Sequence, residues 1–171
     1  PMASNGSVWT VPDFRNRAKA LQKRGGQLVV IDPRRTETAK IADRHLFIRP
    51  ATDGLLLVAL LKAVLTHPER PALPDYIDNL DAVAEAVSGF DSGACAAQCG
   101  VALPDIEWLA DRMVTGPAAL YGRIGAATQS FGTLNAWLIG LINIASGQLD
   151  REGGLLFPTP LVDTVAMAGT G

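Results

Sequence analysis

The stretch 27–36, QLVVIDPRRT, joins a short apolar run to polar side chains that could bind a nucleotide. Residues 28–31 are mostly β-branched and show no polar alternation, as in a strand that is buried on both faces. Asp32 and Pro33 end this strand, because proline cannot donate a hydrogen bond to a neighbouring strand. A carboxylate at the carboxyl end of a buried parallel strand is placed to accept from ribose hydroxyls. Two arginines follow, and Thr36 is suited to cap a new helix.

Two later segments place comparable residues directly after a predicted strand. They are residues 51–53, ATD, and residues 122–125, GRIG. Ligands of parallel sheets bind in the crevice at the carboxyl ends of the strands. We therefore predict that Asp32, Asp53 and Gly122 lie along one edge of the sheet.

Each of these residues also has a purely structural explanation. An aspartate before proline often does no more than form a turn. Thr52 and Asp53 together make a good helix start, although a capping carboxylate can still face a ligand. The spacing Gly-x-x-Gly is by itself a weak signal, since glycines after a strand are more often turn formers than phosphate cradles.

The order of predicted elements indicates the fold class. We predict helices at 12–24, 36–43, 53–65, 76–87, 92–98, 104–114 and 131–145, and strands at 28–31, 45–49 and 118–121. Alternation of this kind predicts an α/β fold, a three-layer αβα arrangement with a mainly parallel, Rossmann-like sheet and a helical insert. Residues 1–157 would form this domain, and residues 158–171, rich in glycine and proline, an irregular tail.

Composition narrows the classes of function. The chain has 171 residues, 48% of them hydrophobic, and a net charge of −2. It has no basic patch interleaved with aromatic residues, which argues against nucleic-acid binding. No apolar run reaches the roughly 18 residues of a membrane span. Cys95 and Cys99 lack the second pair that a zinc site needs, so we predict that they are core residues and name no metal ligand.

Three blocks of sequence resemble the molybdopterin oxidoreductases, the dimethyl sulfoxide reductase family. Residues 31–43, IDPRRTETAKIAD, resemble the family pattern DPR-x-T-x-T-A-x-x-A-D. Residues 48–56, IRPATDGLL, and residues 121–133, YGRIGAATQSFGT, followed by 141–154, agree in order and spacing. The resemblance implies an excised part of a larger molybdenum (or tungsten) oxidoreductase.

The same resemblance implies the cofactor and the partners. The chain would bind the guanine dinucleotide portion of molybdopterin guanine dinucleotide. The metal-ligating side chain, the catalytic residues and a 4Fe–4S cluster are expected elsewhere in the full-length enzyme. Other domains of that enzyme would be the main partners, with an electron-transfer subunit as a further candidate.

The resemblance assigns the nucleotide end of the cofactor to four residues. Asp32 would accept from ribose hydroxyls or a guanine edge. Arg34 would pair with a phosphate or stack on the base. Thr52 and Asp53 would contact the guanine.

The remaining assignments concern the pterin and the phosphates. Gly122 and Gly125 would let the backbone approach the pterin or its phosphates. Arg123 and Gln129 would hydrogen-bond the pterin side. Ser4, in the loop 1–7 together with a second serine, would donate to a diphosphate oxygen.

One departure from the family pattern concerns Ala51, which stands where members generally have glycine. If that position needs a positive φ, alanine strains the loop that carries Thr52 and Asp53. Two other functions remain open. An NADP-type domain would use Arg34 and Arg35 for a 2′-phosphate, but no G-x-G-x-x-G precedes the strand. A non-catalytic scaffold domain would keep the fold without the cofactor.

Overall fold

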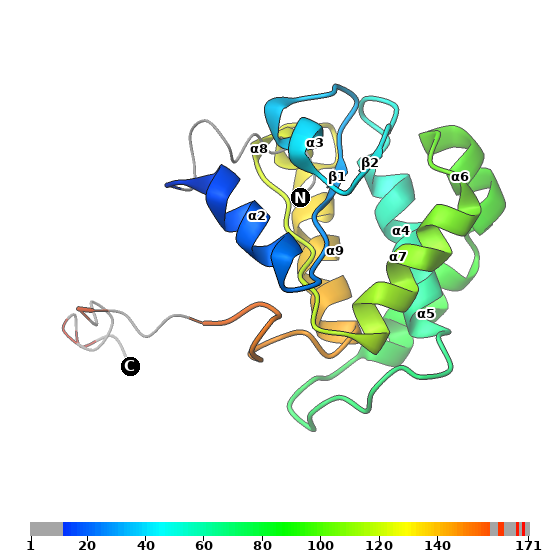
Figure 1. The fold of residues 1–171 in the computed structure, drawn as a ribbon. Coiled ribbons are helices and arrows are strands. Elements are labelled where there is room, and N and C mark those ends of the chain that lie inside the picture. The colour runs from blue at the N-terminus through cyan, green and yellow to red at the C-terminus, as the bar shows by residue number, and fades with distance from the viewer. Residues whose placement is uncertain (1–11, 158–160, 163–166, 168, 170–171) are drawn as a thin grey trace.

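The computed structural model describes residues 12–157 together with 161, 162, 167 and 169. Its elements are α2 (Phe14–Lys23), β1 (Val29–Ile31), α3 (Glu37–Ile41), β2 (Arg44–Leu46), α4 (Asp53–Leu65), α5 (Leu80–Ser88), α6 (Ser92–Cys99), α7 (Leu103–Thr115), α8 (Ile124–Ala127) and α9 (Gly132–Ala145). The fold is α/β, with helices predominating over a small parallel sheet (Figure 1). Ser4, and most of the predicted tail, lie outside the described residues.

The sheet consists of β1 and β2, which run parallel and are joined by α3. Val30 of β1 pairs with His45 of β2 and is fully buried. Thr36 caps α3 as predicted, because its Oγ1 accepts a hydrogen bond from the Ala39 N–H at 3.3 Å. The carboxyl ends of the two strands, and the residues that follow them, therefore lie at the same edge of the sheet.

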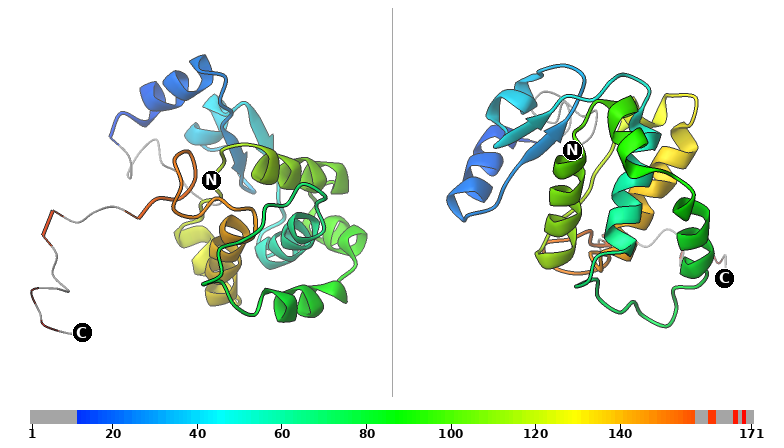
Figure 2. Two further views of the ribbon diagram at one scale, coloured as in Figure 1. Left: turned by 90° about the horizontal axis from the view of Figure 1, so that it is seen from below. Right: turned by 90° about the vertical axis from the view of Figure 1, so that its right-hand side faces the viewer.

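The helix α4 is the centre of the helical part and packs against α5, α6, α7 and α9. Its leucines are buried except for the partly buried Leu55 and Leu65, as expected of a helix without a polar face. Figure 2 shows α2 and the strands on the opposite side of the molecule from α5 and α6. Among the residues that the structure describes, no helix has the length and apolar character to cross a membrane.

Most of the predicted helices are confirmed. α4 has the predicted bounds, and α7 and α9 match their predictions to within one residue at each end. α5 begins at Leu80 instead of residue 76, because the chain turns first and Asn79 has a left-handed backbone with φ 63°. Gly100 ends α6 with a φ of 80°, as the sequence indicated.

The predicted third strand, residues 118–121, is wrong. Two side-chain amides hold the segment. Asn143 of α9 accepts from the Leu120 N–H with Oδ1 and donates to the Leu120 carbonyl with Nδ2, both at 2.9 Å. Gln148 Oε1 accepts from the Ala118 N–H at 3.3 Å. These buried amides satisfy three backbone groups of the segment, and the sheet has two strands within the described residues.

The carboxyl end of α6 holds the chain that follows β2. Arg49 donates its backbone N–H to the Cys99 carbonyl at 2.8 Å, and its Nη1 to the carbonyls of Ala97 and Gln98 at 3.0 and 3.1 Å. These bonds satisfy carbonyls that the helix end leaves without partners. They also draw the chain out of the sheet, so β2 ends at Leu46, before the predicted residue 49.

Cys95 and Cys99 lie in the hydrophobic core as free thiols, which confirms the predicted position. Burial raises the pKa of both thiols, so both stay protonated and unreactive at neutral pH.

Candidate functional site

Asp32 follows β1 at the carboxyl edge of the sheet. Its backbone N–H donates to the Leu46 carbonyl at 3.2 Å, which extends the pairing of the strands by one bond. Its side chain is 8% exposed, and Oδ1 accepts from the Arg34 N–H at 2.8 Å. Asp32 therefore does form a turn, and the hydrogen bond of this turn holds its carboxylate at the end of the strand. Arg34 is exposed beside it.

The loop after β2 brings Asp53 to the same edge. Ala51 has a φ of 64°, so the positive φ that the family glycine suggested is present here with an alanine. Thr52 does not cap α4 with its side chain, because its Oγ1 donates to the Arg49 carbonyl at 2.7 Å. Asp53 is the first residue of α4 and is only 4% exposed. The sequence-based expectation that Thr52 caps the helix is therefore wrong.

The partner of Asp53 comes from the turn between α8 and α9. Gln129 Nε2 donates to Asp53 Oδ2 at 2.5 Å and to the Gly125 carbonyl at 2.8 Å. α8 is positioned in turn by α9, because buried Asn135 donates from Nδ2 to the Ala126 carbonyl at 2.9 Å. These bonds connect the start of α4, the short helix α8 and the core helix α9.

Three segments, within residues 32–36, 50–53 and 124–129, line a hollow of about 470 Å³. Its lining consists of Asp32, Pro33, Arg34, Thr36, Pro50, Ala51, Asp53, Ile124, Gly125 and Gln129. The structure thus brings together Asp32, Arg34, Asp53, Gly125 and Gln129 from the set predicted on sequence. Two carboxylates and one guanidinium around a partly apolar wall can bind a ligand with several hydrogen-bond donors and a nearby anionic group.

Of the predicted binding residues that the structure describes, three are not part of this lining. Thr52 is turned to the Arg49 carbonyl. Gly122 packs closely on α9, where a Cβ would lie 2.4 Å from Ile139 Cδ1, so a packing reason for this glycine is present. Arg123 precedes α8 and is exposed.

The lining also contains residues that the sequence analysis did not assign to binding, such as Thr36 and Ile124. His45 lies outside the lining but contacts one of its residues. Its Nε2 is 3.0 Å from the Asp32 carbonyl oxygen, and its Nδ1 is buried without a hydrogen-bond partner among the described residues. Its place in β2, opposite Val30 and two residues from the level of Asp32, was the available sequence signal.

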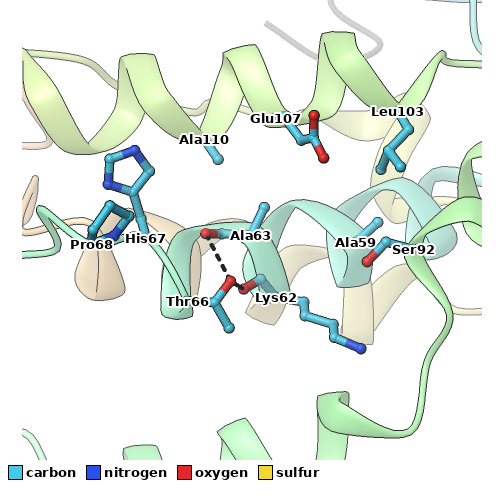
Figure 3. Close-up of a pocket in the computed structure, with 10 residues that line it drawn as sticks. All are labelled: Ala59, Lys62, Ala63, Thr66, His67, Pro68, Ser92, Leu103, Glu107 and Ala110. Carbon is cyan, nitrogen blue, oxygen red and sulfur yellow. Dashed lines mark hydrogen bonds between the residues drawn. The ribbon is translucent and has the colours of Figure 1, made fainter.

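A second hollow, of about 300 Å³, lies between α4 and α7 (Figure 3). Its walls include Ala59, Ala63 and Ala110. Lys62 extends away from α7 in Figure 3, and its Nζ donates to the carbonyls of Ser88 and Phe90 at 2.9 and 2.7 Å. This cation stabilises the connection between α5 and α6, and no predicted binding residue lines the hollow, so the hollow at the sheet edge is the candidate site.

Comparisons with known proteins identify relatives of the chain. No protein-family model matches the chain. The assimilatory nitrate reductase of Haloferax mediterranei is 34% identical over 136 residues, which are 75% of this chain and 18% of that protein. The dimethyl sulfoxide/trimethylamine N-oxide reductase of Cereibacter sphaeroides is 26% identical over 165 residues, 90% of this chain and 20% of that protein.

A solved structure supports the fold. Acetylene hydratase from Pelobacter acetylenicus superposes with a TM-score of 0.70 and 23% sequence identity, over 77% of this chain and 19% of that one. The chain spans about a fifth of the length of the curated relatives it matches. These relatives and the three sequence blocks show that the chain belongs to the dimethyl sulfoxide reductase family of molybdopterin oxidoreductases.

Proposed function

We propose that this chain binds the guanine dinucleotide portion of a molybdopterin cofactor within a larger molybdenum (or tungsten) oxidoreductase. The observation that carries the proposal is the buried Asp53 carboxylate, which lines a hollow at the carboxyl edge of the sheet together with Asp32 and Arg34. A buried carboxylate requires hydrogen-bond donors, and here a side-chain amide supplies one to Oδ2.

The chemistry of the lining fits a guanine nucleotide. Guanine presents two adjacent donors, the ring N–H and the exocyclic amine, and a carboxylate accepts from both with parallel charge-assisted bonds. Adenine offers no such pair. Asp32 at the strand end would accept from ribose hydroxyls, and Arg34 would pair with a phosphate.

The size of the hollow fits one end of the cofactor. Its volume of about 470 Å³ lies within the roughly 300–1,000 Å³ of small-molecule sites. It would accommodate the nucleoside end, while the pterin end would extend toward other surfaces, including Gly122 and Arg123. The predicted Rossmann-like, three-layer arrangement would likewise require strands beyond the two described here.

The metal group, when bound, would supply the oxygen-atom and electron transfer of the whole enzyme. The residues of this chain would bind and orient its nucleotide end. A 4Fe–4S cluster and an electron-transfer subunit belong to the same proposal, as parts of the full-length protein and its surroundings. The substrate is set by residues near the metal, which this proposal places outside the chain.

The proposal is tested with the cofactor-free, full-length protein and four nucleotides: GDP, inosine diphosphate, ADP and NADP⁺. We expect GDP to bind most tightly in calorimetry, inosine diphosphate less tightly because it lacks the exocyclic amine, and ADP weakest. Asp53→Asn should cost roughly 2–4 kcal/mol of GDP binding, the range for disrupting a hydrogen-bonded charge. Asp81→Asn, in the exposed first turn of α5, is the matched control and should change nothing.

Each alternative function has its own outcome in this experiment. Preference for NADP⁺ over GDP would favour the NADP-type domain. No binding of any of the four would favour a scaffold domain. Equal affinity for GDP and ADP would contradict the role of Asp53.

A further inference from the structure

Gln129 occupies the acceptor that the proposed ligand needs. Its Nε2 lies 2.5 Å from Asp53 Oδ2 and 2.8 Å from the Gly125 carbonyl oxygen. One amide nitrogen therefore directs its two protons to two acceptors that both belong to residues of the hollow. The hydrogen bond to Asp53 is charge-assisted, which makes it stronger than a bond between neutral groups.

This bond has a clear physical purpose when no ligand is bound. Asp53 is only 4% exposed, and a buried carboxylate that lacks a hydrogen-bond donor destabilises the folded protein. The amide of Gln129 satisfies Oδ2 in the same manner as the amine or ring N–H of a base would. The ligand and Gln129 therefore compete for one oxygen atom.

The position of Gln129 in the chain allows it to leave. It lies in the turn between α8 and α9, where its neighbours Thr128 and Ser130 are exposed. Its backbone is fixed, because the Gln129 carbonyl accepts from the Gly132 N–H at 3.0 Å. A rotation of the side chain alone can break the bond to Asp53 and leave the core helix α9 unchanged.

We propose that Gln129 is an internal stand-in for the ligand, which occupies Asp53 in the free protein and is displaced when the guanine end enters. The inference rests on the proposed function. It makes Gln129 a specificity-determining residue, because entry requires a ligand whose donors replace the amide on Asp53. A base without a donor at that edge leaves the buried carboxylate unsatisfied once Gln129 is displaced.

The test measures GDP affinity of the cofactor-free, full-length protein. GDP is the suitable probe because it has no pterin, so a contact of Gln129 with the pterin cannot contribute. Gln129→Met keeps the length of the side chain and removes its donor. We expect GDP to bind about tenfold more tightly to this variant, since no bond has to be broken, which corresponds to about 1.4 kcal/mol. Gln98→Met, on the exposed surface of α6, is the matched control and should leave the affinity unchanged.

A second comparison isolates the pair of side chains. In an Asp53→Asn background, where no charged acceptor remains to be released, Gln129→Met should alter GDP affinity less than twofold. If Gln129→Met does not fold, as judged by circular dichroism and thermal melting, Gln129→Asn replaces it. Its amide is one methylene shorter and cannot reach Asp53 from the same backbone position, so tighter GDP binding is expected again.

The outcomes separate this inference from the proposed function. GDP that binds to the wild type but not more tightly to Gln129→Met overturns the inference alone. Weaker binding to that variant would likewise overturn it, and would make Gln129 a direct contact of the nucleotide. Absence of GDP binding to the wild type would overturn the proposed function together with the inference.

Discussion

Ala51 gives the sharpest test of the site's backbone geometry. It has a φ of 64° in the loop that leads from β2 into α4, and its side chain is exposed. The left-handed region suits glycine, because a Cβ there crowds the following carbonyl oxygen. We therefore predict that Ala51→Gly stabilises the protein, although it removes a side-chain atom and increases the freedom of the unfolded chain.

The magnitude follows from two opposing terms. The left-handed conformation costs an L-residue about 1–2 kcal/mol. The greater backbone freedom of glycine in the unfolded state offsets about 0.5–1 kcal/mol of this. Because Ala51 is exposed, no core packing is lost on substitution. The net gain in the free energy of unfolding should be about 0.5–1 kcal/mol.

The assay is unfolding of the two proteins by urea and by heat. A gain of this size should raise the midpoint of thermal unfolding by about 1–4 °C in a protein of this length. The matched control is Ala86→Gly on the exposed face of α5. There the same chemical change should lower stability by about 0.5–1 kcal/mol, since glycine disfavours a helix interior.

The two variants should thus shift stability in opposite directions. If Ala51→Gly lowers stability as much as Ala86→Gly does, the loop at Ala51 is not left-handed and the argument for strain is refuted. Ala51→Val gives a further check. A β-branched side chain is worse than alanine at positive φ, so this variant should be less stable than the wild type.

Two further predictions concern α9 and the edge of the sheet. Gly132→Ala should destabilise the protein by roughly 1–3 kcal/mol in urea unfolding, because the new Cβ would lie 1.8 Å from the Ala127 carbonyl oxygen. At Gly140 in the same helix a new Cβ would have no other atom within 4 Å, so Gly140→Ala should stabilise the protein by about 0.5–1 kcal/mol. Equal changes in stability from the two substitutions would contradict this geometry. The Asp43 carboxylate accepts from the Leu28 N–H at 2.7 Å and from Gln22, which lowers its pKa from the ordinary 3.8. Its contribution to stability is therefore present above about pH 4 and lost as the pH falls through the lowered pKa, so wild type and Asp43→Asn should converge in thermal stability in acid and differ at neutral pH.

The helices were the most predictable part of the fold. α4 could be predicted to the residue, because its leucine-rich run is bounded by the loop at 51–52 and by Thr66. α7 and α9 followed from apolar periodicity and from their proline and glycine boundaries. The segment 118–121 was misread because its apolar pattern resembles a strand, and nothing local reveals that Asn143 and Gln148 supply its hydrogen bonds.

The part of the site that follows the two parallel strands was predictable, because strand direction places the residues after both strands at one edge of the sheet. Asp32 and Asp53 were expected at one edge of the sheet, and both line one hollow. From the third block, Gly125 and Gln129 line the hollow instead of Gly122. Their position depends on α8, which is too short to show a periodic pattern in the sequence. The departure at Ala51 raised the question of a positive φ, and the structure gives that residue a φ of 64°.

The binding of residues 116–121 by side-chain amides has a consequence for the order in which the chain can fold. Asn143 and Gln148 follow this segment by more than twenty residues. Gln148 Nε2 also donates to the carbonyls of Met113 and Gly116, at 2.7 and 2.8 Å. During synthesis the ribosome adds residues from the amino terminus, so α4 and α7 emerge first and can pack on each other. The segment at 116–121 must then wait, its backbone hydrated, until α9 has left the exit tunnel. Its attachment is therefore a late event, in contrast to the pairing of β1 with β2, whose partners lie close together in the sequence.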